Sequence, residues 1–372
     1  MHVDYVSISS IFIKLELRYL DQENQMEAEL ASIIKVWILV IVSLSYCFYF
    51  SSKLPKGIFR LLSLTPVFFL FLYLPLTVSS AHVVGLTTFF LAWLGNLKLL
   101  LFAFDQPPLS PPPPTLFRFI SLASLPIKHK TTAPSQPPHN ISHHLPKPVL
   151  LAIKVGILAL VYHYYNYKQH LHKNVVIAMY CIQLYIELEL MFAMAAVPVR
   201  AIQGLELEPQ FNEPYLATSL QDFWGRRWNL MATGILRPTV YDPVRRISAR
   251  VLGPMWVSLP AVLAVFVVSG LMHELLFYYW SHVAPSWEVT WFFILHGVAT
   301  TVEVAVKKVV PEKKRLPRAV SWLLTLGFTV STTLWLFFPP IVRTGVDERL
   351  TRDFPELVDY FQGLLPSCLA LL

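Results

Sequence analysis

The stretch that decides the fold is Val251–Trp280, VLGPMWVSLPAVLAVFVVSGLMHELLFYYW. It is long enough to cross about 30 Å of hydrocarbon, and Pro260 predicts a kink or break inside it. It carries His273 in a setting that is otherwise apolar. An ionisable group is costly inside a membrane and needs a partner, water or a cavity there. The stretch therefore predicts a transmembrane helix and makes His273 the first candidate for chemistry.

Composition extends this prediction to the whole chain, because 55% of the residues are hydrophobic, 14% are charged and mean hydropathy is +0.52. Such values are typical of integral membrane proteins. We expect an all-α, polytopic transmembrane helical bundle of about eight spans, within a range of seven to nine. Besides Val251–Trp280, the apolar runs are Val36–Phe50, Leu61–Thr77, Val83–Phe104, Val149–Tyr165, Asn174–Val197, Val289–Val306 and Val320–Pro340, with Leu357–Leu372 as a possible ninth.

Lysine and arginine alternate between the loops that join these runs, with counts of 3, 0, 4, 2, 7, 0 and 6. Because cytosolic loops retain the positive charges, the odd loops are predicted to be cytosolic. They include a Pro-rich loop, 106–148, and an Arg-rich loop, 198–250. The net charge of +7 then reflects topology and contact with anionic membrane lipids rather than nucleic-acid binding.

Two segments lie outside the predicted bundle. Residues 1–25 are polar and mixed, lack the pattern of a signal peptide, and are interpreted as an accessory extension ahead of a domain that spans residues 26–372. In the Pro-rich loop, Pro111 to Pro114 exclude a regular helix and predict an extended, exposed connector.

The histidines fit neither of two metal-site patterns that occur in membrane enzymes. His139, His143 and His144 have a spacing similar to that of membrane di-iron enzymes, but prolines on both sides disfavour a metal-binding helix. The sequence His273-Glu274-Leu-Leu-Phe277 has Phe where a zinc protease needs its second histidine ligand. No metal or other cofactor is therefore expected.

Three segments together resemble a known family. They are Val83–Asp105 with Asn96-Leu-Lys-Leu-Leu-Leu-Phe-Ala-Phe104, then Asn212-Glu-Pro-Tyr-Leu-Ala-Thr-Ser-Leu-Gln-Asp-Phe-Trp-Gly-Arg-Arg-Trp-Asn229, and Ser269-Gly-Leu-Met-His-Glu274. The chain resembles the plant wax synthases, long-chain-alcohol O-fatty-acyltransferases of the membrane-bound O-acyltransferase superfamily, from Met26 to its C-terminus, apart from the Pro-rich loop. The family's polar Asn falls on Asn229 and its membrane His on His273.

The resemblance implies ester formation between a fatty acyl-CoA, as co-substrate, and a long-chain alcohol, in a multi-pass protein of the endoplasmic reticulum. A neutral His273 is suited to remove the hydroxyl proton as general base. Asn229 can donate a hydrogen bond to the thioester oxygen or position the acyl carbonyl. Arg226 and Arg227 are candidates to bind CoA phosphates, although topology alone also places arginines there. Trp224 and Trp228 flank them as candidate acyl-CoA contacts.

Other polar groups in the spans are weaker candidates. His296 and Glu303 are seven residues apart, so both can face the bundle interior beside His273, and Glu274 is its neighbour; these three are supporting candidates. Glu187 and Glu189 are two residues apart and cannot share a helix face, so structural pairing is favoured over a carboxylate base. Lys98 is interpreted as an anchor that reaches the cytosolic interface.

The topology places His273 toward the lumenal side, whereas Asn229 lies in a cytosolic loop. A tunnel across the bilayer, or re-entry of the Arg-rich loop into the membrane, would bring them together. The acceptor also stays open, because related proteins esterify sterols or transfer acetyl groups to diacylglycerol. From another class, a lipid or small-solute transporter, or an inactive homologue, is the remaining alternative.

Overall fold

The computed structural model describes residues 5–127, 147–203 and 209–353, and this part of the chain is helical, without strands. Seven of its helices are long and apolar enough to cross a membrane, and Val149–Tyr165 adds a shorter apolar helix. The prediction of an all-α bundle with about eight spans is confirmed. The seven candidate spans are Gln25–Lys53, Ile58–Thr77, Ala81–Ala103, Lys173–Ala195, Leu259–Ser281, Glu288–Val309 and Arg318–Arg343. Leu357–Leu372 lies outside the described residues.

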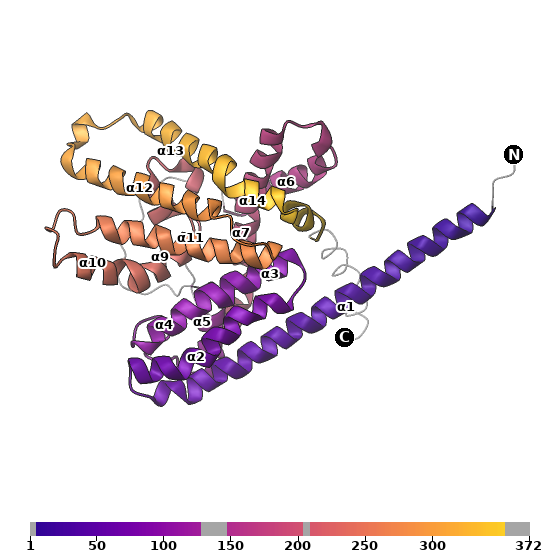
Figure 1. Ribbon diagram of the computed structural model, residues 1–372, viewed down its shortest axis with the longest axis horizontal. Coiled ribbons are helices and arrows are strands. Elements are labelled where there is room, and N and C mark those ends of the chain that lie inside the picture. The colour runs from indigo at the N-terminus through magenta and orange to yellow at the C-terminus, as the bar shows by residue number, and fades with distance from the viewer. Residues whose placement is uncertain (1–4, 128–146, 204–208, 354–372) are drawn as a thin grey trace.

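The helices follow one another along the chain as Figure 1 shows. The long ones are α1 (Tyr5–Tyr49), α2 (Ile58–Tyr73), α6 (Lys147–Tyr165), α7 (Lys173–Gln203), α11 (Leu259–Ser281), α12 (Glu288–Val309) and α13 (Arg318–Thr332). The third span consists of α3 (Ala81–Thr87), the π-helix η3 (Thr88–Gly95) and α4 (Asn96–Ala103), and α13 continues through the π-helix η9 (Thr333–Phe337) into α14 (Phe338–Arg343). The shorter ones are α5 (Leu116–Ser124), α8 (Leu220–Asp222), η6 (Phe223–Arg227), α9 (Leu230–Leu236), η7 (Arg237–Tyr241) and α10 (Asp242–Ser248).

Residues 5–25, which we interpreted as an accessory extension, form the first part of α1. Figure 1 shows this part of the helix projecting beyond the body of the molecule. The described chain is therefore helical without a break from Tyr5 to Tyr49, and the boundary at residue 26 stays a prediction.

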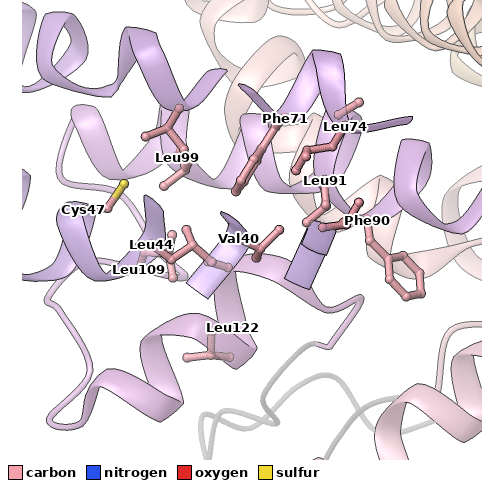
Figure 2. Packing of buried hydrophobic residues seen from close by; sticks show 14 of the residues in the cluster. Val40, Leu44, Cys47, Phe71, Leu74, Phe90, Leu91, Leu99, Leu109 and Leu122 are labelled. Carbon is pink, nitrogen blue, oxygen red and sulfur yellow. The ribbon is translucent and has the colours of Figure 1, made fainter. Parts of the chain in front are cut away.

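The Pro-rich loop differs from the sequence prediction. Its described part contains helix α5, and Leu109, Phe119 and Leu122 are buried against α1 and the third span. Figure 2 shows Leu109 and Leu122 in the same cluster as Val40 and Leu44 of α1. The prediction of an extended, exposed connector is wrong for Leu109 and for residues 116–127, because prolines exclude a helix only where they occur and α5 begins after them; residues 111–115, which include the proline run, are non-helical and mostly exposed.

Lys98 also differs from its predicted role as an anchor. Its side chain is fully buried, and Nζ donates to the carbonyl oxygens of Leu122 and Leu125 at 2.7 and 2.6 Å. These carbonyls lie at the C-terminal end of α5, where unpaired acceptors and the helix dipole favour a cation. Lys98 therefore attaches α5 to the third span instead of reaching toward the membrane surface.

The loops rich in lysine and arginine gather at one end of the bundle. Arg60, at the end of the first loop, donates to the carbonyl oxygen of Phe102, before the third, at 3.0 Å. Lys308, at the seventh loop, donates to Ser258, after the fifth, at 2.8 Å, and α4 contacts η7. This arrangement agrees with the alternation of charge along the sequence.

Helices α11 and α12 form the hairpin that carries His273. Its crossing is close: a Cβ on Gly297 would meet Cβ of Phe266 at 2.7 Å, and one on Gly270 would meet Cα of Thr290 at 3.2 Å. Helix α11 begins at Leu259 with Pro260 in its first turn, where proline is favoured because no carbonyl awaits its missing N–H. The long run Val251–Trp280 is thus broken near Pro260, as expected, and residues 251–258 precede the helix.

Candidate active site

His273 lies inside the bundle on α11, eight residues before the helix ends at Ser281. Its Nδ1 is 2.8 Å from the carbonyl oxygen of Ser269, one turn earlier. A carbonyl can only accept, so Nδ1 carries the proton and Nε2 of the neutral ring has a free lone pair. No described residue makes a hydrogen bond to Nε2, and the side chain is partly exposed. The imidazole is therefore held as the tautomer that a general base needs.

The surroundings of His273 are aromatic. The imidazole centroid lies 4.3 Å from the ring of Phe293, 6.2 Å from Phe337 and 6.3 Å from Trp93. Trp93 belongs to the π-helix η3 and Phe337 to the π-helix η9. Such π-helical turns are uncommon and frequently occur at functional sites. An aromatic environment around a neutral base favours a lipid reactant over a polar one.

The Arg-rich segment is not a simple loop outside the membrane. Its helix α9 buries Met231, Ile235 and Leu236 in a cluster with Trp93, and the partly buried Met272 packs against this cluster. Trp93 is in the middle of the third span, and Met272 is next to His273. Re-entry of this segment into the bundle, one of the two sequence interpretations, is therefore what the structure has.

Asn229 is the residue from which α9 starts. Its backbone is left-handed, with φ 41° and ψ 68°, and its Oδ1 accepts from the backbone N–H of Ala232 at 3.1 Å. Asparagine tolerates this conformation and is a preferred N-cap. The cap uses the amide oxygen, while the Nδ2 donors have no partner among the described residues. The geometry leaves Asn229 able to donate, which is the role considered for it.

Trp224 connects the re-entrant segment to α12. Its indole N–H donates to Nδ1 of His296 at 3.0 Å, and Nε2 of His296 lies 2.8 Å from the hydroxyl of Thr332. Because that hydroxyl donates to the carbonyl oxygen of Phe328 at 2.8 Å, it accepts the proton of Nε2. Both ring nitrogens of the fully buried His296 are thus occupied, and this histidine positions neighbours instead of acting as a base.

Glu303 and Glu274 each hold the start of a helix. Glu303 accepts from the backbone N–H of Leu220 at 2.7 Å and pairs with Lys307. Glu274 is buried and accepts from the N–H of Trp287 and from the N–H and hydroxyl of Thr290, at 2.9 to 3.1 Å. His296 and Glu303 do share a face, as their spacing predicted, but the face binds the re-entrant segment, and neither residue hydrogen-bonds to His273.

The two arginines of the motif differ in environment. Arg227 is buried; its Nε donates to the carboxylate of Asp222 at 2.7 Å and its Nη1 to the carbonyl oxygen of Asn212 at 3.1 Å. Arg226 is exposed, without a side-chain partner in the described part of the chain. Trp228 stacks on Phe223, with ring centroids 5.6 Å apart. Only Arg226 therefore presents a guanidinium to a ligand.

The intramembrane carboxylates Glu187 and Glu189 are paired within the α6–α7 hairpin. Lys154 donates to Glu189 at 2.7 Å, and Tyr162 donates to Glu187 at 2.6 Å. Structural pairing, the favoured interpretation, is what the structure has, and these groups belong to a network separate from His273. The histidines 139, 143 and 144 lie outside the described residues.

Trp93 is a member of the site that sequence reasoning missed. A tryptophan in an apolar run is usually a core or membrane-facing aromatic, so it gave no signal by itself. The pattern that could have pointed to it is its place three residues before Asn96, inside the first of the three motifs.

Fold and site together define a multi-span helical membrane enzyme with a base-competent histidine in an aromatic interior. Residues 207–295 match the model of the membrane bound O-acyl transferase family. This range includes both Asn229 and His273.

Several curated proteins are similar over most of this chain. It is 49% identical to the probable long-chain-alcohol O-fatty-acyltransferase 1 of Arabidopsis thaliana over 90% of the chain and 98% of that protein. It is 46% identical to the long-chain-alcohol O-fatty-acyltransferase of Simmondsia chinensis, over 93% and 99%. It is also 46% identical to acyl-CoA–sterol O-acyltransferase 1 of Arabidopsis thaliana, over 88% and 95%. The chain belongs to the membrane-bound O-acyltransferase family and is a wax synthase-like, multi-pass O-acyltransferase.

Proposed function

We propose that this chain transfers a fatty acyl group from acyl-CoA to a long-chain alcohol and so forms a wax ester. The observation that carries the proposal is the free Nε2 of His273, whose Nδ1–H donates to the Ser269 carbonyl in an aromatic environment. The relatives named long-chain-alcohol O-fatty-acyltransferases support the same acceptor.

The chemistry follows from the tautomer. The alcohol oxygen attacks the thioester carbon while its proton passes to Nε2 of His273; the C–O bond forms, the C–S bond breaks, and the proton then neutralises the CoA thiolate. General-base catalysis of this kind contributes about 10²- to 10⁴-fold to a rate. The Nδ2–H of Asn229 is proposed to donate to the thioester oxygen as it gains charge, and Arg226 to bind a CoA phosphate.

Membrane topology is part of the proposal. The cationic end of the bundle faces the cytosol, where acyl-CoA is soluble, and the alcohol enters from the hydrocarbon. On the family resemblance we assign the protein to the endoplasmic reticulum, and residues 26–372 to one acyltransferase domain. Fractionation against organelle markers tests the location; a chain that starts at Met26 and retains full ester formation would support the domain boundary.

A sterol is the second candidate acceptor, because the sterol acyltransferase is as similar to this chain as one of the wax synthases is. The deciding experiment supplies membranes with labelled palmitoyl-CoA or acetyl-CoA and a panel of fatty alcohols, sterols and diacylglycerol. We expect wax ester from palmitoyl-CoA and the fatty alcohol. Sterol ester, or acetylated diacylglycerol, would replace that acceptor in the proposal.

The catalytic assignment needs variants in the same assay. His273→Ala, expressed to the same level, should lower the rate by about 10²- to 10⁴-fold, whereas His170→Ala, at an exposed histidine of the loop after α6, should retain it. Equal product from the His273 variant would overturn the general-base role. No product from any pair of substrates would favour the inactive homologue or transporter.

A further inference from the structure

A second group at the His273 site lacks a partner in the protein. Trp93 is only 6% exposed, yet its indole Nε1 makes no hydrogen bond within the described residues. An indole N–H can only donate, and buried donors are nearly always satisfied in folded proteins. An unsatisfied one is unfavourable, so its position calls for an explanation.

Three other tryptophans, the partly buried Trp280 and Trp224 and the exposed Trp322, show what an N–H bonded within the chain does. Trp280 donates to the carbonyl oxygen of Ala81 at 2.8 Å, Trp322 to that of Tyr215 at 2.8 Å, and Trp224 to His296 at 3.0 Å. Trp93 differs from these three. Its N–H is therefore able to bind a group from outside the chain.

The position of Trp93 indicates what that is. Its ring lies edge-on to the imidazole of His273, with centroids 6.3 Å apart, and it packs in one cluster with Met231 of the helix that Asn229 caps. Trp93 is thus a neighbour of His273 and of the helix that starts after Asn229. The π-helical turn η3 that carries it is a feature enriched at functional sites.

Two groups of opposite kind without a partner among the described residues belong to these neighbouring rings, the donor on Trp93 and the acceptor Nε2 on His273. Hydrogen bonds join heavy atoms about 2.7–3.0 Å apart, so one oxygen atom can connect two rings whose centroids are 6.3 Å apart. A hydroxyl is suited to this, since it donates one proton and accepts with its lone pairs. In an aromatic environment, a hydroxyl without such a donor would be poorly solvated.

We propose that the indole N–H of Trp93 binds the oxygen of the acceptor alcohol while the hydroxyl proton points to Nε2 of His273. This rests on the proposed acyl transfer and applies to a fatty alcohol and a sterol alike, because both present a hydroxyl. Trp93 is then a catalytic residue that touches the nucleophile: it selects a hydroxyl over an apolar chain end and holds it for attack on the thioester carbon.

The test compares Trp93→Phe with Trp280→Phe in the full-length protein. For Trp93→Phe, KM for hexadecanol should rise about tenfold, the loss of one buried hydrogen bond, with KM for palmitoyl-CoA unchanged and little loss of thermal stability. Trp280→Phe, which removes an N–H bonded within the protein, should lower stability and leave KM for hexadecanol unchanged.

A binding measurement that needs no turnover separates this proposal from the proposed function. Labelled hexadecanol is bound to purified protein and displaced by 1-methoxyhexadecane, whose oxygen can only accept, or by hexadecane. The ether should compete about tenfold better than the alkane on the unmodified chain and lose that advantage in Trp93→Phe.

Ester formation by the unmodified chain, with unchanged hexadecanol KM and unchanged ether preference in Trp93→Phe, would overturn the role of Trp93 and leave the proposed function standing. A fall in kcat with no change in hexadecanol KM would also overturn it, since the N–H would then act on another atom. If the unmodified chain forms no ester, the proposed function fails, and the ether comparison still tests Trp93.

Discussion

The indole N–H of Trp224 donates to Nδ1 of His296, 72 residues later in the chain, at 3.0 Å. This bond joins the re-entrant segment to the middle of α12, and the ring of Phe293, one turn before His296, lies 4.3 Å from that of His273. The positions of Asn229 and His273 are therefore linked through α12, although the two residues come from segments that the sequence places on different sides of the membrane.

Breaking that link should affect the site without removing a reacting group. His296→Ala leaves the N–H of Trp224 and the hydroxyl of Thr332 without their partner, which costs about 1–3 kcal/mol for a buried group. We expect lower thermal stability and at least about a tenfold lower kcat. His296→Asn, which can still accept from Trp224, should recover part of both.

The matched control for the indole is Trp335→Phe, because Trp335 is exposed on the same bundle. Trp224→Phe should reproduce the effect of His296→Ala, whereas Trp335→Phe should not. Unchanged kcat in both His296→Ala and Trp224→Phe would show that this link is not needed to position the site.

Substitution of Arg226 should change substrate binding, whereas substitution of Arg227 should change stability. Arg226→Ala removes an exposed cation and is expected to raise KM for acyl-CoA several-fold, more strongly at low salt because exposed charges are screened, while stability stays the same. The dephospho-CoA thioester lacks the 3′-phosphate. If Arg226→Ala raises KM for this thioester by the same factor, Arg226 binds another phosphate of CoA.

Arg227→Ala is expected to act on stability instead. It leaves the carboxylate of Asp222, whose side chain is 21% exposed, without its ion pair, and breaking a buried pair costs about 3 kcal/mol where burial is nearly complete. Thermal unfolding of the detergent-solubilised protein measures this. A stable Arg227→Ala protein with a raised KM for acyl-CoA would instead place Arg227 in the substrate site.

The sequence predicted the spans and His273 for the same physical reason. A bilayer requires long apolar helices, and an imidazole within one of them is conspicuous because it is costly. The re-entrant segment was only one of two alternatives, since Arg226 and Arg227 carry the charge signal of a cytosolic loop. Burial of Arg227 against Asp222 removes that charge from the membrane surface, and no local pattern reveals such pairing.

Lys98 and Trp93 illustrate a second limit. Lys98 was expected to reach the interface, but it binds carbonyls at the end of α5. This helix was not predicted, because the prolines before it indicate an extended loop. Trp93 is visible as a candidate only once its N–H is found without a partner. Both depend on what lies across the bundle, whereas hydropathy reports on one segment at a time.

Glu274 is predicted to fix the α11–α12 hairpin rather than to exchange protons. Glu274→Ala removes three hydrogen bonds at the start of α12, and caps of this kind are worth about 0.5–2 kcal/mol. Stability and kcat should both fall, because the register of His273 against Phe293 depends on this contact. Glu274→Gln, which keeps one acceptor, should retain more of both, and the pH profile of kcat should keep its shape in either variant.

Substitution of Glu189 provides the last test, because it shows whether this carboxylate is structural or acts as a second base. Glu189→Ala leaves the ammonium of Lys154, 9% exposed, without the carboxylate that it contacts at 2.7 Å, and loss of one member of a largely buried pair destabilises by about 3 kcal/mol. We expect a lower unfolding temperature with unchanged kcat per folded molecule.

The double variant Lys154→Met with Glu189→Leu removes both charges and should restore stability, because the uncompensated charge is gone. If kcat falls in the double variant while stability returns, the carboxylate itself takes part in the reaction, and the assignment of His273 as the sole base among the described residues would have to be given up.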